Sequence, residues 1–368
     1  MTIMKKNIIL FILHMPPPIH GAAIIGQSLR NSKLINNEFD CEYINLTTAS
    51  SLEDIGKFKI RKISQFFHLL LNIIKTVKNT QPNLVYITPN SKGGPFYKDF
   101  LIMMALKFMN CNIVAHYHNK GVSTRQNKIF DNFLYKHFFK DIKIILLSKR
   151  LYPDIERYVM SKDVYICPNG ISEEMPTPQK GDREKTVRIL FLSNLLIQKG
   201  VFFLLDALQA LHAKGIDFSC HIVGAESSEI TRVFLSKIIK EKKLYNCVFY
   251  HGSKYGIDKE QFWNNADIFV FPSLDECFPL VLLEAMKHGL PIVTTDEGGI
   301  PDIVKDGENG FICEKRSAKD LAEKILLLLN DPSLRKRMGE NGLEHFKENY
   351  TIAAFENQLT SIFKQILG

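Results

Sequence analysis

The feature that most constrains this chain is a double alternation of short apolar segments with longer helical patterns. Short runs of β-branched and aromatic residues are typical of strands, whereas apolar residues three or four positions apart are typical of helices. Strands are expected at 7–14, 39–46, 83–88, 111–118, 142–148 and 164–168, and again at 187–193, 218–224, 247–252, 267–273, 291–296 and 310–313. Strands that alternate with helices form parallel sheets covered on both faces.

A polar linker at 172–186 separates the two series, and 368 residues are too many for one ordinary core. We therefore expect an α/β fold of two Rossmann-like domains that face each other across a cleft. The first would span 1–172 and the second 187–350. The last segment, 351–368, is expected to be a helix that packs back toward the N-terminal domain, after a helix at 331–346 capped by Asp331 and Pro332.

The charge is distributed unevenly between the halves. Residues 1–172 contain 23 Lys and Arg against 11 Asp and Glu, a net of +12, and the remainder contains 24 against 28, a net of −4. The first half is thus suited to an anionic partner, either nucleic acid or anionic lipid. Seven cysteines without a C-x-x-C pair favour reduced thiols in a cytoplasmic protein. The start is compatible with a signal peptide, but a first strand is favoured because no small-residue cleavage site follows.

The segment 275–291, DECFPLVLLEAMKHGLP, places one carboxylate before a helix and another within it. In parallel sheets ligands bind beyond the carboxyl ends of the strands, and this helix follows such a strand. Pro279 is expected as the first helical residue, and the helix N-terminus would bind a phosphate. Glu284 would then reach a hydroxylated group beyond that phosphate, with Glu276 on its other side. In the alternative, Glu284 pairs with a core Lys or Arg and Glu276 is a solvated loop residue.

Two loops of the first half also follow strands. In PPPIHGAAIIG, Gly21 is expected to open a helix and let a ligand approach the backbone, although a simple strand–helix turn explains it equally. In HYHNKG, His118 is a candidate functional residue, and His116 is expected to be a structural residue of the strand.

The segment 273–304 resembles the signature of the family-4 retaining glycosyltransferases of the GT-B fold, with two glutamates separated by seven residues and a Gly298-Gly299 turn. Further matches lie at 193–200, 221–224, 168–170 and 306–312, so that the resemblance covers essentially the whole chain. It implies that Glu284 holds the ribose of a nucleotide-sugar. It also implies that Glu276 contacts the donor sugar near its 3- and 4-hydroxyls.

The resemblance implies further donor contacts. Lys199 matches the family's diphosphate-binding lysine, but Ser193 and Asn194 stand where the family has Gly-Arg, which puts the strength of that binding in question. His118 matches a histidine beside the donor sugar and its C6 hydroxyl. Gly21 lies in the loop that usually carries Gly-Gly. The donor-binding residues are thus expected to be Gly21, Ser193, Asn194, Lys199, Gly224, Phe278, Pro279, Leu280 and Glu284, with His118 and Glu276 catalytic.

The sequence contains no Asp-x-Asp, the common metal–diphosphate clamp. We therefore expect no metal and no cofactor, with the leaving diphosphate stabilised by Lys199 and the helix N-terminus. The nucleotide-sugar is a substrate, and a UDP-sugar is favoured over a GDP-sugar.

Two helical segments, 57–78 and 127–140, are both basic and apolar. Their apolar residues either cover the sheet or dock on an anionic bilayer. The residues that favour docking are Lys59, Arg61, Lys62, Phe66, Phe67, Phe138 and Phe139. Nucleic acid is disfavoured because no binding motif is present. We expect a cytoplasmic protein, with a peripheral position at the inner face of the cell membrane left open.

These observations predict a retaining, metal-independent glycosyltransferase of hexosyltransferase type. The expected acceptor is a lipid-linked saccharide of bacterial surface polysaccharide synthesis, which charge and the family's habits favour. Two alternatives stay open: a nucleotide-sugar 2-epimerase on the same fold, and a catalytically weak nucleotide-sugar-binding protein, which Asn194 favours. A nicotinamide enzyme is disfavoured because no G-x-G-x-x-G follows either first strand.

Overall fold

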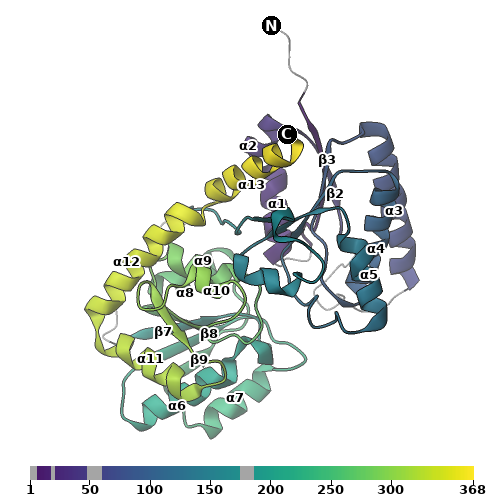
Figure 1. The fold of residues 1–368 in the computed structure, drawn as a ribbon. Coiled ribbons are helices and arrows are strands. Elements are labelled where there is room, and N and C mark those ends of the chain that lie inside the picture. The colour runs from purple at the N-terminus through teal and green to yellow at the C-terminus, as the bar shows by residue number, and fades with distance from the viewer. Residues whose placement is uncertain (1–5, 18–20, 48–59, 175–185) are drawn as a thin grey trace. The chain divides into compact units, whose positions relative to one another are not determined.

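The computed structural model describes residues 6–17, 21–47, 60–174 and 186–368, without the side chains of 60–62. The chain divides into two compact units. Unit 1 comprises residues 1–170 and 352–368, and unit 2 comprises residues 171–351. Figure 1 shows a parallel sheet with helices in each unit.

The sheet of unit 1 has the strand order β2-β1-β3-β4-β5-β6, and all its pairs are parallel. Its strands are β1 (Ile8–Leu13), β2 (Asp40–Asn45), β3 (Leu84–Ile87), β4 (Ile113–Tyr117), β5 (Lys143–Leu146) and β6 (Val164–Ile166). Its helices are α1 (Gly21–Asn31), α2 (Lys33–Glu38), α3 (Ile60–Thr80), α4 (Gly93–Phe108), α5 (Ile129–Phe139) and α13 (Ile352–Leu367), with short 3₁₀ turns η2 (Lys149–Asp154) and η3 (Ser161–Asp163). Every residue of β3 and β4 is buried, as expected where helices cover both faces.

The helix α13 completes the core of unit 1, although it follows unit 2 in the sequence (Figure 1). The fully buried ring of Phe363 lies 5.8 Å from that of Phe11, 5.9 Å from Phe39 and 5.5 Å from Tyr86. These aromatic contacts join the last helix to the first and third strands.

The sheet of unit 2 has the order β12-β11-β10-β7-β8-β9, again all parallel. Its strands are β7 (Arg188–Leu192), β8 (Ser219–Val223), β9 (Val248–Tyr250), β10 (Ile268–Phe271), β11 (Ile292–Thr295) and β12 (Gly310–Cys313). Its helices are α6 (Val201–Ala213), α7 (Arg232–Glu241), α8 (Gly256–Asn265), α9 (Leu280–Lys287), α10 (Ile300–Ile303), α11 (Ala318–Asn330) and α12 (Pro332–Asn349), with the 3₁₀ turn η4 (Ile197–Lys199). Each strand expected from the sequence contains one observed strand, so the two parallel sheets are confirmed.

The basic and apolar segments form α3 and α5, but the prediction of their exposed aromatics is largely wrong. Phe66, Phe138 and Phe139 are buried under neighbouring rings, and of the four only Phe67 is exposed. In α3, adjacent helical positions point in different directions, so Phe66 faces the core and Phe67 does not. In α5, both Phe138 and Phe139 pack against neighbouring rings. Lys59 and the side chains of Arg61 and Lys62 lie outside the described residues. Within the described part of the chain, no helix is both long and apolar enough to cross a bilayer.

Candidate functional site

The candidate donor residues of unit 2 follow β7, β8 and β10, in loops and in α9, at the carboxyl edge of the sheet, where ligands of such sheets bind, and the Gly298-Gly299 turn follows β11. Three glycines let these loops approach one another more closely than any side chain would permit. They are Gly224, Gly200 and Gly298, and each has a positive φ.

Gly224 joins the loop after β8 to the loop after β7. Its φ is 155°, and a Cβ there would lie 1.7 Å from the carbonyl oxygen of Ser193. The Ser193 N–H donates to Val223 O at 2.9 Å, and the Asn194 side-chain oxygen accepts from Ala225 N at 3.4 Å. Ser193 and Asn194, predicted to contact the donor, are thus held against the β8 loop by backbone contacts.

Gly200 brings Lys199 to the loop after β10. Gly200 has a φ of 81°, and a Cβ there would lie 2.0 Å from Pro272 O. The Lys199 Nζ forms an ion pair with Glu276 Oε1 at 2.5 Å, and Ser273 Oγ donates to the same oxygen at 3.1 Å. The Glu276 side chain is only 10% exposed. It is therefore not the solvated loop residue of the alternative interpretation, but part of a Lys199–Ser273–Glu276 cluster.

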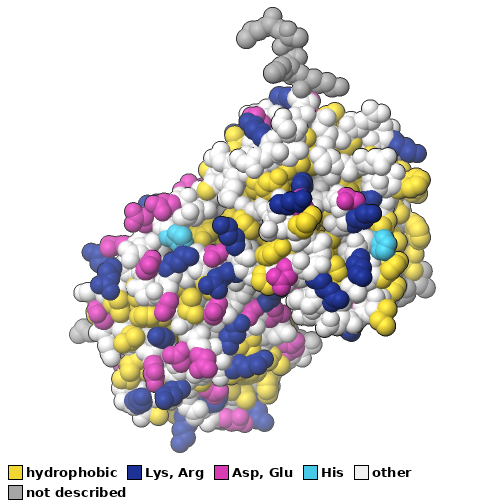
Figure 2. All heavy atoms as spheres, viewed as in Figure 1, with side chains coloured by type: hydrophobic (Ala, Val, Ile, Leu, Met, Phe, Trp, Pro, Cys, Tyr) yellow, Lys and Arg dark blue, Asp and Glu magenta, His cyan; other side chains and the backbone are white. Residues whose placement is uncertain are grey.

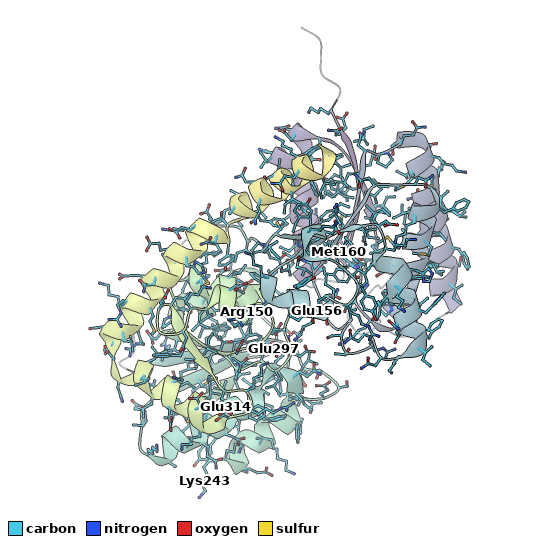
Figure 3. The ribbon with its side chains drawn as sticks, viewed as in Figure 1. Arg150, Glu156, Met160, Lys243, Glu297 and Glu314 are labelled. Atoms are coloured by element: carbon cyan, nitrogen blue, oxygen red, sulfur yellow. The ribbon has the colours of Figure 1, made fainter. Side chains whose placement is uncertain are left out.

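The backbone of Glu276 is fixed by the glycine turn after β11. Gly298 has a φ of 55°, and a Cβ there would lie 2.2 Å from Glu276 O, while Gly299 N donates to Cys277 O at 2.7 Å. Beside this turn the buried carboxylate of Glu297, labelled in Figure 3, is ion-paired with Lys315. The sequence interpretation missed Glu297, although its position directly after a strand was a usable signal.

The helix α9 begins one residue later than predicted. Pro279 is its N-cap, with a ψ of 118°, and Leu280 is the first helical residue, so the placement of Pro279 at the first helical position is wrong. The extended ψ of Pro279 excludes it from the helix, and Leu282 N donates to Pro279 O at 3.1 Å. The N–H groups of Leu280 and Val281 then have no acceptor within the helix. Phe278 is buried, with its ring 5.9 Å from that of Tyr350.

Glu284, on the second turn of α9, is ion-paired with Lys259 of α8. The Lys259 Nζ lies 2.8 Å from Oε1 and 2.6 Å from Oε2. Both side chains are about one-quarter exposed, at 24% for Glu284 and 25% for Lys259. This is the lysine partner of the alternative interpretation. No spacing motif links positions 259 and 284, so the sequence interpretation did not identify Lys259.

In unit 1, Gly21 is the first residue of α1 and His118 follows β4, as expected. The ring of His118 lies 4.3 Å from that of His116. His116 is fully buried in β4 and hydrogen-bonds through Nδ1 to the Tyr86 hydroxyl at 2.7 Å, as expected of a structural residue of the strand. Burial lowers the pKa of His116 well below its usual value, and His118 lowers it further.

The loop after His118 is held by Asp154, which the sequence interpretation missed. Its carboxylate accepts from the N–H groups of Gly121 at 2.8 Å, Val122 at 3.1 Å and Ser123 at 3.0 Å. A carboxylate that receives three backbone N–H groups fixes the loop conformation.

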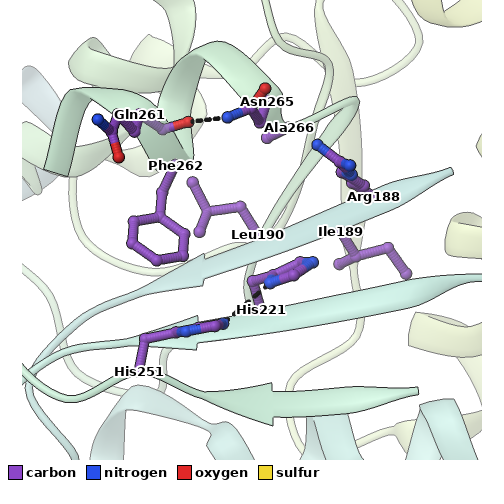
Figure 4. Close-up of a pocket in the computed structure, with 9 residues that line it drawn as sticks. All are labelled: Arg188, Ile189, Leu190, His221, His251, Gln261, Phe262, Asn265 and Ala266. Carbon is purple, nitrogen blue, oxygen red and sulfur yellow. Dashed lines mark hydrogen bonds between the residues drawn. The ribbon is translucent and has the colours of Figure 1, made fainter. Parts of the chain in front are cut away.

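A cavity of about 230 Å³ lies on the α8 side of the sheet of unit 2 (Figure 4). Its lining includes Phe262, Arg188 and two histidines, His221 and His251, whose Nδ1 and Nε2 atoms lie 2.9 Å apart. Burial lowers the pKa of His251, and Lys254 and Arg232 lower it further. No predicted donor residue lines this cavity, so it is separate from the site at the carboxyl edge. No cluster of three or more His, Cys, Asp or Glu side chains suited to a metal occurs within the described ranges.

Comparison with known proteins relates unit 2 to a family of glycosyltransferases. The family model described as "Glycosyl transferases group 1" matches residues 172–345, essentially unit 2. An uncharacterized glycosyltransferase, MJ1178, of Methanocaldococcus jannaschii is 30% identical over 63% of this chain and 62% of its own length. The capsular polysaccharide biosynthesis glycosyltransferase CapM of Staphylococcus aureus is 30% identical over 48% of this chain and 46% of its own length. The chain thus matches less than two thirds of the length of these relatives.

Solved structures show the same fold over nearly the whole chain. Anabaena Alr3699/HepE in complex with UDP has a TM-score of 0.75 at 16% identity, covering 98% of this chain and 100% of that one. The apo form of the lipopolysaccharide outer core galactosyltransferase WaaB has a TM-score of 0.72 at 18% identity, covering 97% and 99%. The chain has the α/β fold of the GT-B glycosyltransferases, and its residues 172–345 match the glycosyl transferases group 1 family model.

Proposed function

We propose that this protein is a retaining glycosyltransferase that moves a hexosyl group from a nucleoside diphosphate sugar to an acceptor hydroxyl. The observation that carries the proposal is the Lys199–Ser273–Glu276 cluster, which lies in the loops leading to the α9 N-terminus. A lysine ammonium and the N–H groups of a helix N-terminus are the groups that bind a diphosphate.

In the transfer step, the bond between the anomeric carbon and the β-phosphate oxygen breaks, and negative charge accumulates on the diphosphate. Lys199 and the N–H groups of Leu280 and Val281 would stabilise this charge without a metal, because preorganised donors act where charge develops. A bound diphosphate would compete with Glu276 for the Lys199 ammonium. A released Glu276 carboxylate could then accept hydrogen bonds from sugar hydroxyls, and His118 of unit 1 would lie beside the same sugar.

For Glu284 we propose the ribose, whose hydroxyls would donate to the carboxylate while Lys259 stays ion-paired with it. A UDP-sugar is the proposed donor, supported by the fold shared with Alr3699/HepE, whose structures hold UDP, UDP and glucose, or UDP-glucose. CapM, named for capsular polysaccharide biosynthesis, supports a surface saccharide as the acceptor. Lipid linkage of that acceptor and a peripheral cytoplasmic location belong to the proposal.

The test is a thermal-shift screen across UDP- and GDP-sugars, followed by titration of Glu284→Ala and Lys259→Gln. Loss of a hydrogen bond to a charged group costs about 1.5–3 kcal/mol, so Glu284→Ala should weaken UDP binding roughly 10- to 150-fold. Lys259→Gln leaves the Glu284 carboxylate in place and should weaken UDP binding less than Glu284→Ala does. If both variants lose the same stability while UDP affinity is unchanged, the pair is purely structural and the ribose assignment is wrong.

Turnover separates transfer from the other enzymatic interpretation. A transferase releases UDP in proportion to acceptor, whereas a 2-epimerase on this fold converts donor without one. Glu276→Gln and His118→Ala should reduce turnover while UDP still binds, since both residues are assigned to the sugar. Product anomeric configuration by NMR tests retention, and full activity in EDTA tests metal independence. UDP-sugar binding without turnover for any acceptor would favour the binding-protein alternative.

A further inference from the structure

One face of unit 1 exposes many large apolar side chains. The helices α3, α4 and α5 contact one another in that order and form a layer over the sheet. Their exposed apolar residues are Ile63, Phe67, Leu71, Leu101, Phe108, Ile129, Phe130 and Phe133. Figure 2 shows hydrophobic and basic side chains next to one another over this part of the unit. We call this surface the α3–α5 face.

The α3–α5 face is ordered along its helices. In α3 the exposed residues run Phe67, Leu71, Lys75 and Lys78, and in α5 they run Phe130, Phe133, Lys136 and Lys140. Among these side chains the apolar residues precede the lysines, although Lys128 is exposed directly before α5 and Phe108, at the end of α4, is also exposed. Helices that connect parallel strands run antiparallel to them, so the exposed Phe67 and Leu71 of α3 and Phe130 and Phe133 of α5 lie toward the carboxyl edge of the sheet. His118 follows β4 at this same edge.

Acidic residues do not neutralise these lysines. Residues 63–140 contain ten Lys and Arg but only two acids, Asp99 and Asp131, a net of +8. Both carboxylates are buried. Asp131 accepts from Arg125 Nε and from the Tyr97 hydroxyl, each at 2.7 Å, and Asp99 accepts from Asn90 N at 2.8 Å. Apart from Asp141, which is exposed directly after Lys140, the exposed charges of the face are positive.

We propose that the α3–α5 face docks on an anionic lipid bilayer. Aromatic and aliphatic side chains at its apolar end would enter the interfacial region, and the lysines behind them would contact lipid phosphates. The absence of exposed acids on these described helices favours a lipid surface over a second copy of this chain, because two such faces would repel each other. Docking is independent of the transfer activity proposed above and would bring the carboxyl edge of unit 1 to the membrane.

The experiment is co-sedimentation of the full chain with vesicles. Wild type should pellet with phosphatidylglycerol vesicles, pellet poorly with phosphatidylcholine vesicles, and be released as salt rises toward roughly 0.5 M, where screening is strong. Each lysine near an anionic surface strengthens membrane binding about fivefold. Lys136→Gln/Lys140→Gln should therefore weaken binding to phosphatidylglycerol vesicles about 30-fold. Phe130→Ser/Phe133→Ser should weaken it at least tenfold, roughly, through lost apolar burial.

Matched controls come from α7 of unit 2, which also exposes Val233 and two lysines but has Glu226, Glu229 and Glu241 nearby. Lys237→Gln/Lys240→Gln and Val233→Ser should leave vesicle binding unchanged. All variants should keep the wild-type melting temperature, since only exposed side chains change. The proposal is overturned if wild type ignores phosphatidylglycerol vesicles or if the α3–α5 variants pellet like wild type. Equal losses of vesicle binding in the α7 variants overturn it too. The proposal also fails if wild type forms a dimer in solution and Phe130→Ser/Phe133→Ser dissociates that dimer but still binds vesicles.

Discussion

Unit 1 and unit 2 share one architecture, six parallel strands covered by helices, but they place their charges differently. In unit 2, three carboxylates at or near the carboxyl edge, Glu276, Glu284 and Glu297, are ion-paired with lysines and largely shielded from solvent. In unit 1, the lysines of α3 and α5 stay exposed while the nearby acids are buried. Charges held in such pairs suit the recognition of one small ligand, whereas a broad field of one sign suits an extended surface.

The same difference extends to the backbone. The unit 2 loops touch through glycines at distances that leave no room for a Cβ, so the position of Glu276 depends on Gly298. In unit 1, the loop after β4 depends instead on the carboxylate of Asp154. Adding a single methyl group at one of these glycines should therefore disturb the candidate site of unit 2. A substitution in one unit should leave the other unit unchanged.

The largest expected effect is on the stability of unit 1. Phe363→Ala should cost about 3–5 kcal/mol, because it opens a cavity among the rings of Phe11, Phe39 and Tyr86. Hydrogen exchange resolved by peptide should show faster exchange in β1 and β3, with β7 and β10 unchanged. The exposed Ile257→Ala serves as the control. Equal loss of protection in both sheets would mean that the units unfold together.

The next effect concerns turnover. Lys199→Ala should lower the turnover number for the donor by about 10²–10³, the usual loss when one preorganised donor to developing charge is removed. Steady-state kinetics with the preferred nucleotide-sugar measures it, and Lys240→Ala, a change of an exposed lysine in the same unit, is the control. Vesicle binding should not change. A Lys199→Ala enzyme with normal turnover would remove the functional contrast between the two units.

A smaller effect, on the stability of unit 2, distinguishes the cost of a left-handed φ from the cost of a steric clash between loops. Gly298→Ala should destabilise unit 2 by about 2–3 kcal/mol, because an alanine must adopt a left-handed φ and would meet Glu276 O. Gly307→Ala, with a φ of 80° and nothing within 4 Å of the new Cβ, should cost only about 1 kcal/mol. Denaturant titration compares the two. Equal losses of unfolding free energy in the two variants would show that the close approach of Gly298 to Glu276 O does not add to the cost of the alanine.

The smallest effect is a pH dependence in unit 1. The pKa of buried His116 lies well below its usual value, so the unfolded chain binds this proton first as the pH falls. The stability from neutral His116 is present above about pH 6.5 and is lost below it, at roughly 1.4 kcal/mol per pH unit at most. His116→Gln should flatten the fall in unfolding free energy between pH 6.5 and 5.5, roughly, while the exposed His212→Gln should not. Parallel curves for all three proteins would contradict the assignment.

The sequence predicted the strands well because they are buried on both faces and therefore form nearly unbroken apolar runs, as in β3. It predicted the helix at α9 but not its first residue, because Pro279 fits both the cap and the first turn. The assignment of the donor residues rests on their position after the strands and on the resemblance. The contacts that organise them could not be predicted, since the Lys259–Glu284 pair joins two helices through a geometry that no local pattern encodes.

The exposed surface of unit 1 was harder to predict for a related reason. In FFHLLL and KHFFK, two adjacent aromatics look equivalent in sequence, but in α3 Phe66 is buried and Phe67 exposed. In α5 both Phe138 and Phe139 are buried, whereas Phe130 and Phe133 are exposed. In α5 apolar residues lie on all sides, so periodicity does not distinguish the outward stripe, and the packing against the sheet decides it.

The return of α13 to unit 1 has a consequence for biosynthesis. Residues 1–170 leave the ribosome first, but the ring of Phe363, which fills the space beside β1 and β3, is made only after all of unit 2. Unit 2 is contiguous in sequence, so its sheet can be completed while the nascent first half still lacks its last helix. Unit 1 therefore cannot complete its aromatic core until the residues of α13 have been synthesised.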